Sequence, residues 1–154
     1  MQTFLPYPSF TQTARCLDYR RLGKQRVEAK QLLLALGVAV GDHRPKPSSW
    51  ASHPAARMWR GHEANLAEYG LVICAEWIDR GYKDTLYGQF AAARRSILDD
   101  AVGAHDPNWL GYEGFHRSHR SNLLRKDAAY YGRFGWREPP DLPYFWPVEA
   151  GVLA

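Results

Sequence analysis

The sequence predicts an all-α fold, a small single-domain helical bundle over residues 1–154 with an extended N-terminal arm and an aromatic C-terminal tail. Apolar residues recur at helical spacing over several long stretches. Alternation of period two never extends beyond a few residues, so no substantial sheet is expected. A chain of 154 residues is long enough to bury about two-thirds of its unfolded surface in one core.

The chain is expected to begin with an extended arm and a short helical turn. Pro6 and Pro8 push the residues before them out of helical geometry. After them, Ser9 or Thr11 is suited to cap a turn that runs through Leu17. The first eight residues should therefore be extended.

Two long helices are expected in the first half of the chain. The first spans residues 19–40, with Asp18 as its cap, and Gly37 and Gly41 are expected to end it; a loop over 43–52 follows. Its apolar positions are Leu22, Ala29, Leu33 and Leu36. The second spans residues 54–81 and begins with a proline, which suits a first turn. Its apolar stripe consists of Met58, Leu66, Tyr69, Ile73 and Trp77.

Two further helices and a tail complete the expected fold. Asp84 is suited to cap a helix over residues 86–101, and a last helix is expected over 116–134. The tail, residues 138–148, contains four prolines and the run Tyr144–Phe145–Trp146. These features predict an extended, aromatic C-terminal segment.

The positive charge is concentrated in two segments. The net charge is +4, while residues 15–30 carry +4 and residues 115–137 carry +5, so the remainder sums to −5. Two basic segments on an otherwise acidic chain are typical of a polyanion-binding face, provided that they meet in space. The alternative is a pair of solvated helix faces that point apart.

The sequence contains no segment typical of membrane or secreted proteins. No apolar run reaches the roughly 20 residues that a membrane span needs. The start, MQTFLPYPSF, lacks the pattern of a secretory signal. Cys16 and Cys74 are too few for a disulfide framework and are interpreted as free cytosolic thiols. We therefore expect a cytoplasmic, nucleoid-associated protein that makes no membrane contact.

No metal site is expected. His116 and His119 lie one helical turn apart, but zinc needs a third and a fourth ligand at suitable spacing. His53, His62 and Cys74 do not provide that spacing. Hydrogen bonding or phosphate contact is the preferred interpretation of the paired histidines.

Glu28 is the one carboxylate in the cationic helix expected over residues 19–40. Lys24 lies four residues before it, and Gln25 and Gln31 lie three residues to either side, so all of them share its helix face. From the residues alone, the default interpretation is an exposed Lys24–Glu28 pair worth a few tenths of a kcal/mol.

Three blocks of sequence, in order, resemble the pyrimidine-dimer DNA glycosylase (endonuclease V) family. The first is Leu17, Asp18 and Leu22 followed by Glu28 six residues after the leucine. The second is HPAARMWRGHEANLAEYGLVICAEWIDRGYKDT, residues 53–85. The third is FHRSHRSNLLRKDAAYY, residues 115–131, which is similar to the family's basic last helix.

The resemblance implies a DNA glycosylase with AP-lyase activity that uses no metal or organic cofactor. In such enzymes a terminal α-amine attacks C1′ of the damaged nucleotide, a Schiff base forms, and β-elimination cuts the strand. Glu28 stands at the position of the catalytic glutamate. An α-amine is easier to deprotonate than a lysine, since the reference pKa values are about 8 and about 10.4.

The sequence departs from the family pattern near this site. A bulky second residue such as Gln2 blocks removal of the initiator methionine, so the terminal amine is expected to be that of Met1 itself. The segment between the N-terminus and Glu28 is also longer than in the family pattern. Arg21 stands where the family pattern has a histidine. Lys24 remains a rival nucleophile, and the identity of the damaged base stays open.

The expected partner is double-stranded DNA that carries a lesion or a modified base, bound by a monomer. Expected DNA contacts from the two basic segments are Arg21, Lys24, Arg26, His116, Arg117, His119, Arg120, Arg125 and Lys126. Tyr144 and Trp146 are expected to wedge or stack at the distorted site; the alternative is a tail that folds back onto the core. Two other functions stay open: a glycosylase for another modified base, and a non-catalytic DNA- or RNA-binding module.

Overall fold

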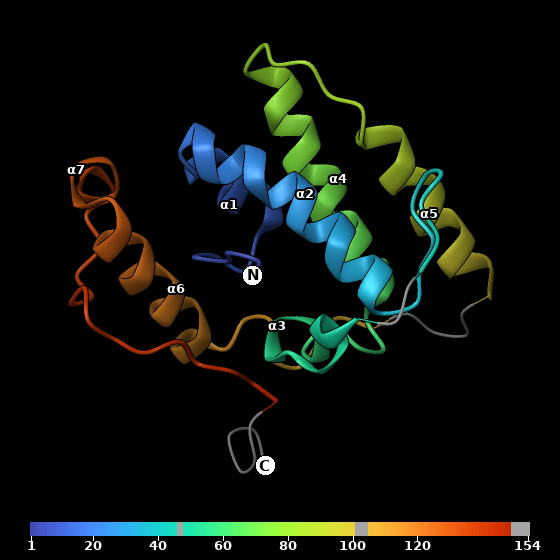
Figure 1. Cartoon of the computed structure of the whole chain (residues 1–154). Coiled ribbons are helices and arrows are strands. Elements are labelled where there is room, and N and C mark those ends of the chain that lie inside the picture. Colours follow the sequence, from blue (N-terminus) through green and yellow to red (C-terminus); the bar gives the residue numbers. More distant parts are fainter. Residues whose placement is uncertain (46–47, 101–104, 149–154) are drawn as a thin grey trace.

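The computed structural model describes residues 1–45, 48–100 and 105–148 (Figure 1). Over these residues the fold is all-α, as predicted, and its one pairing of extended backbone is an isolated bridge between Val40 and His43. The α-helices are α1 Phe10–Cys16, α2 Tyr19–Ala35, α3 Pro54–Arg57, α4 Glu63–Asp79, α5 Tyr87–Asp100, α6 Glu113–Lys126 and α7 Ala128–Tyr131. Two 3-10 helices complete the set: η1 Ser49–Ser52, inside the expected loop, and η2 Gly132–Phe134.

The helix starts follow the capping residues of the sequence. Ser9 and Asp18 each accept a hydrogen bond from the backbone N–H three residues later, and α1 and α2 begin directly after them. Asp84 accepts from two backbone N–H groups at the start of α5. All three predicted caps are confirmed, because a side-chain carboxylate or hydroxyl satisfies N–H groups that have no partner within the helix. The predicted end of α5 at Ala101 lies outside the described residues.

The expected unbroken helix over residues 54–81 is wrong. The chain makes one helical turn in α3, then turns at Gly61 and starts again as α4. Gly61 has φ +84°, a left-handed conformation that glycine adopts without strain. The turn brings Trp59 fully into the core, where its Nε1 donates to Thr3 Oγ1 at 3.0 Å.

Two other helices are shorter than expected. The first long helix ends at Ala35 rather than at residue 40, and Gly37 follows with φ +92°. The last helix is divided at Asp127, whose backbone leaves the helical conformation (φ −153°, ψ 78°) and whose carboxylate accepts from Tyr130 N at the start of α7. A carboxylate in the middle of the basic helix therefore acts as a cap.

The core forms where α4 packs between α2 and α5 (Figure 1). Gly70 of α4 lets α5 approach closely, since a Cβ at this position would lie 2.6 Å from the Phe90 ring. Most of the predicted apolar positions of the two long helices are buried, while Leu36 and Trp77 are half-buried. The largest fully buried side chains are Trp59, Tyr69, Tyr131, Phe90, Phe115, Leu5, Leu17, Leu22, Leu32, Leu33, Leu66 and Ile73.

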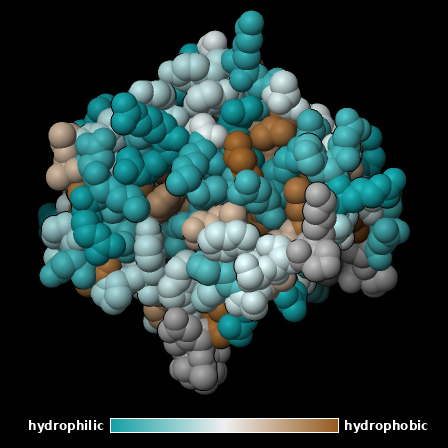
Figure 2. Space-filling model, viewed as in Figure 1, coloured by the Kyte–Doolittle hydropathy of each residue, from teal (hydrophilic) through white to brown (hydrophobic). Residues whose placement is uncertain are grey.

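The arm and the tail are both extended, as predicted, and both lie along α6. The arm passes between α2 and α6 (Figure 1). The tail returns along α6, where Leu142 N donates to Ser121 Oγ at 3.0 Å and Phe145 N donates to Ser118 Oγ at 3.1 Å. Hydrophilic side chains cover most of the face seen in Figure 2. None of the described helices is long and apolar enough to cross a membrane.

Candidate functional site

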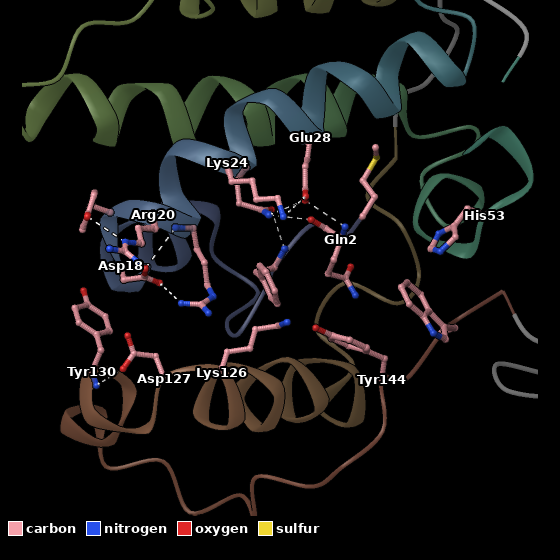
Figure 3. A pocket seen from close by; sticks show the side chains of 16 residues that line it. Gln2, Asp18, Arg20, Lys24, Glu28, His53, Lys126, Asp127, Tyr130 and Tyr144 are labelled. Atoms are coloured by element: carbon pink, nitrogen blue, oxygen red, sulfur yellow. Dashed lines mark hydrogen bonds and ion pairs between the residues drawn. The ribbon is translucent and has the colours of Figure 1, made fainter. Parts of the chain in front are cut away.

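A cavity of about 880 Å³ opens between α2, the arm, and the junction of α6 and α7 (Figure 3). It is the place where the two basic segments meet in space. Its lining residues are Met1, Gln2, Phe4, Asp18, Tyr19, Arg20, Arg21, Lys24, Gln25, Glu28, His53, Lys126, Asp127, Tyr130, Tyr144 and Trp146.

Side chains of α2 hold the start of the arm. Gln2 to Leu5 are buried, so their backbone groups need partners that a sheet would otherwise supply. Gln2 N donates to Glu28 Oε2 at 3.2 Å, and Phe4 N donates to Gln25 Oε1 at 3.0 Å. Gln25 Nε2 donates in turn to the Gln2 carbonyl at 2.9 Å. Two residues on one face of α2 therefore fix the first residues of the chain.

Side chains of α6 hold the next part of the arm. Leu5 N donates to His119 Nδ1 at 2.9 Å, and the Leu5 carbonyl lies 2.7 Å from His116 Nδ1. Arg120 Nη1 donates to the Pro6 carbonyl at 2.8 Å. The arm is thus clamped from both sides, although it pairs with no strand.

The two clamping histidines are neutral. Gly111 N donates to His116 Nε2, so the His116 proton is placed on Nδ1, where it bonds the Leu5 carbonyl. Burial lowers the pKa of His116, and complete burial together with the neighbouring His116 lowers that of His119 to about 3. Both rings therefore act as fixed hydrogen-bonding groups of the fold.

Three of the residues expected to contact DNA are buried in the fold. His116 and His119 are fully buried, and Arg120 is 9% exposed and paired with Glu113 and Glu138. None of the three lines the cavity. Their side chains hold the arm and the tail, so the expectation that they contact phosphates is wrong for this structure.

Arg26 also lies away from the cavity. It pairs with Asp84 at the start of α5, and its guanidinium lies 5.0 Å from the centre of the Trp77 ring. The position of Arg26 on the core side of α2 follows from its spacing with Leu22 and Ala29. Arg26 therefore links α2 to the α4–α5 pair.

The remaining expected cations are divided between the cavity lining and the exposed face of α6. Arg21, Lys24 and Lys126 line the cavity. Arg117 and Arg125 are exposed on α6 outside the lining. Arg21 pairs with Asp18 at 3.1 Å. Burial alone raises the pKa of Asp18, but hydrogen bonds from Tyr131 and Arg21 and the charge of Arg21 outweigh it and lower that pKa.

Glu28 is 8% exposed and lies at the wall of the cavity. Gln25 Nε2 donates to its Oε2 at 3.1 Å, and Lys24 Nζ lies 3.6 Å from its Oε1. The Lys24 side chain is 73% exposed, so this ion pair contributes little stability. The expectation of an exposed Lys24–Glu28 pair is therefore correct for Lys24. It is wrong for Glu28, which is buried and hydrogen-bonded.

The terminal amine lies near Glu28. The bond from Gln2 N to Glu28 Oε2 measures 3.2 Å, and one residue spans about 3.8 Å, so the Met1 nitrogen lies within roughly 7 Å of this oxygen. No ion pair of 4.0 Å or less joins the two groups in the part of the chain that the structure describes. The amine and the carboxylate are therefore close neighbours in the cavity lining that are not joined by a direct ion pair.

Several residues of the lining were not chosen as site residues from the sequence, among them Gln2, Gln25 and His53. Gln25 shares the helix face of Glu28, so its spacing was the available signal. His53 opens the central block of sequence, but nothing in that block indicates the direction of its ring. Within the described residues, no group of three or more His, Cys, Asp or Glu side chains is placed to hold a metal ion.

A cation-lined cavity that contains a buried carboxylate beside a terminal amine is a candidate active site for a polyanionic substrate. A family model described as pyrimidine dimer DNA glycosylase matches residues 1–87, more than half of the 154 residues. The chain therefore belongs to the pyrimidine dimer DNA glycosylase family. The matched stretch contains the arm, α2 and α4, while α6 and the tail lie beyond it. No curated protein and no solved structure matches the chain.

Proposed function

We propose that the protein excises damaged pyrimidines, pyrimidine dimers above all, from double-stranded DNA and cuts the strand at the resulting abasic site. The observation that carries this proposal is the hydrogen bond from Gln2 N to Glu28 Oε2, which holds the terminal residue beside a buried carboxylate. The family membership supports the glycosylase step. The reaction needs no metal or organic cofactor, because an amine and a carboxylate supply the chemistry.

In the proposed reaction the neutral Met1 amine attacks C1′ of the damaged nucleotide. The C1′–N1 bond breaks, and the carboxylate of Glu28 stabilises the positive charge that develops on the sugar. The amine loses a proton, and the C1′–O4′ bond opens as O4′ takes up a proton, which leaves a Schiff base at C1′. Loss of a proton from C2′ then breaks the C3′–O bond by β-elimination and cuts the strand. The arm clamps keep the amine within reach of C1′, which lowers the entropic cost of the attack.

Lys24 is the rival nucleophile. At neutral pH a reference α-amine is neutral in about a tenth of molecules, a reference lysine in about one of several thousand. The Lys24 ammonium is also exposed and forms an ion pair with the Glu28 carboxylate. We therefore propose Met1 as the nucleophile and Lys24 as a phosphate contact.

The basic residues around the cavity are proposed to bind the DNA backbone. Arg21, Lys24 and Lys126 line the cavity, and Arg117 and Arg125 extend the cationic surface along α6. Tyr144 and Trp146 place aromatic rings in the lining, where they are suited to stack on an unpaired base. We propose that one copy of the chain binds one lesion.

Borohydride trapping on a duplex with an abasic site tests the nucleophile. The wild-type protein should become covalently linked to DNA, and selective acetylation of the terminus or one added residue before Met1 should abolish the link. Lys24→Ala should only weaken it. Lys30→Ala is the matched control, since Lys30 lies on the same helix, bonds to Gln89, and does not line the cavity.

The other outcomes separate the alternatives. Trapping that survives acetylation but is lost in Lys24→Ala would assign the nucleophile to Lys24. DNA binding without any trapping would identify a non-catalytic module. Excision of a different modified pyrimidine, with dimer-containing duplexes left intact, would identify a glycosylase for another base.

A further inference from the structure

The two ends of the cavity differ in chemistry (Figure 3). Asp18, Arg20 and Asp127 lie toward one end, which is charged. Gln2, His53 and Tyr144 lie toward the other end. Besides the Glu28 carboxylate bonded to Gln2 N, the second end offers amide, imidazole and aromatic groups.

His53 is held rigidly at this second end. It is the N-cap of α3, and its Nδ1 accepts a hydrogen bond from Ala55 N at 3.0 Å. The Trp50 ring centre lies 5.0 Å from the His53 ring, and the Trp146 ring meets it edge-on at 5.7 Å. Figure 3 shows the His53 ring directed from its helix toward the cavity. The orientation of its Nε2 is therefore set by both the cap and the packing.

The cap also determines the tautomer of His53. An Nδ1 atom that accepts from a backbone N–H carries no proton, so the proton of the neutral ring is on Nε2. Protonation of Nδ1 would place its N–H against the Ala55 N–H, so two hydrogen-bond donors would face each other without an acceptor. Partial burial and the positive charge of the chain terminus both lower the pKa of His53. The cavity is thus lined by a neutral imidazole whose Nε2–H is a donor.

Gln2 provides a second neutral donor at the same end. Its Oε1 accepts from Thr3 N at 2.9 Å, and its buried Nε2 has no partner among the described residues. A buried donor without a partner is uncommon, because it loses its hydrogen bonds to water without replacement. An acceptor that arrives with a ligand would satisfy it.

We propose that His53 is a catalytic residue that donates its Nε2–H to the O2 carbonyl of the departing pyrimidine. The inference rests on the proposed function, since it assigns the end lined by Gln2, His53 and Tyr144 to the base and the end lined by Asp18, Arg20 and Asp127 to the backbone. A pyrimidine has carbonyl acceptors on its edge and a π-face for Tyr144 and Trp146.

The chemistry of departure explains why a neutral donor is useful. As the amine nitrogen bonds to C1′, the C1′–N1 electron pair passes to the base, and the negative charge spreads onto O2. The Nε2–H hydrogen bond strengthens as this charge develops, so it stabilises the transition state more than the bound substrate. The proton released by the attacking amine passes to Glu28 and then, through solvent, to the departed base. His53 contributes a hydrogen bond and transfers no proton.

Two variants separate this role from folding. His53→Asn keeps a good N-cap for α3, but its side chain is too short to reach the cavity. His53→Phe keeps the ring against Trp50 and Trp146 but has no donor. Both variants should lose about 100-fold in excision of a pyrimidine dimer from a duplex. Both should still be trapped by borohydride on a duplex with a preformed abasic site, because no base departs from that substrate.

His105→Phe is the matched control, since His105 is exposed and lies outside this cavity. It should keep both reactions. A pyrimidine with a more acidic N1 should reduce the excision defect of His53→Asn, because a better leaving group needs less stabilisation. Excision at the wild-type rate by both variants would overturn the inference, as would an equal loss of excision and trapping. Failure of the wild-type protein to trap abasic DNA would instead overturn the proposed function.

Discussion

His119 links the position of the arm to pH. Its ring is fully buried, accepts the N–H of Leu5, and has a pKa lowered by burial from 6.5 to about 3. In the unfolded chain the ring is free to take up a proton at pH 5, whereas in the folded protein it is not. Its contribution to stability is therefore complete above pH 6.5 and is lost as the pH falls from 6.5 toward about 3.

The size of this effect follows from the two pKa values. At pH 5 the unfolded ring is roughly 97% protonated and the folded ring roughly 1%, which corresponds to about 2 kcal/mol relative to pH 8. The free energy of unfolding in urea should be measured at pH 8 and pH 5 for the wild-type protein and for His119→Gln. The variant lacks the titrating ring, so its loss of stability on acidification should be smaller by about 2 kcal/mol.

The comparison isolates one group. His116 also has a pKa lowered by burial, and it acts in the same direction, but it is present in both proteins. His119→Gln is expected to be less stable at both pH values, because its bond to Leu5 N is altered. This constant loss does not affect the change in the free energy of unfolding between pH 8 and pH 5, which is the quantity compared. An identical pH dependence in the two proteins would refute the assignment of His119 as a buried neutral clamp.

Three further outcomes are expected. Glu28→Gln should lower excision by about 100-fold or more while DNA affinity measured by gel shift stays nearly the same; a rate above about a tenth of wild type would refute its role. Lys126→Ala should lower the slope of log affinity against log salt by about one, because one phosphate contact is lost. Arg120→Met should leave this slope unchanged and lower the melting temperature. A slope that changes for Arg120→Met and stays the same for Lys126→Ala would place Arg120 at the DNA. Gly70→Ala should destabilise the protein by about 1–3 kcal/mol in urea unfolding, because its Cβ would lie 2.6 Å from the Phe90 ring; unaltered stability would show that α5 shifts freely.

Local interactions allowed the sequence to predict the helices and their starts. Ser9, Asp18 and Asp84 cap helices through backbone groups two or three residues away, so the sequence alone contains both partners of each bond. Apolar spacing likewise identified the buried faces. The breaks at Gly61 and Asp127 were missed, because glycine and aspartate also occur inside helices and only packing determined that the chain turns there.

Part of the candidate site was also predicted, because residues three or four apart in the sequence share a helix face. Glu28 stood out as the one carboxylate of a cationic helix, and Lys24 and Gln25 shared its face by spacing. The resemblance to a known family, and not the spacing, gave Glu28 a role. His53 gave no such signal, because the direction of its ring depends on contacts with Trp50 and Trp146, and the latter is far away in the sequence.

Only the tertiary structure determined what the charged and titratable residues of the last helix do. By itself the sequence established a basic segment over residues 115–137, an all-α fold and a glutamate in a cationic helix. It did not separate His119 and Arg120, which hold the arm across 114 residues of sequence, from Arg117 and Lys126, which stay exposed. The physical reason is that the buried arm has backbone groups with no strand beside them. Whichever α6 side chains face the arm must bond to these groups, and packing alone selects them.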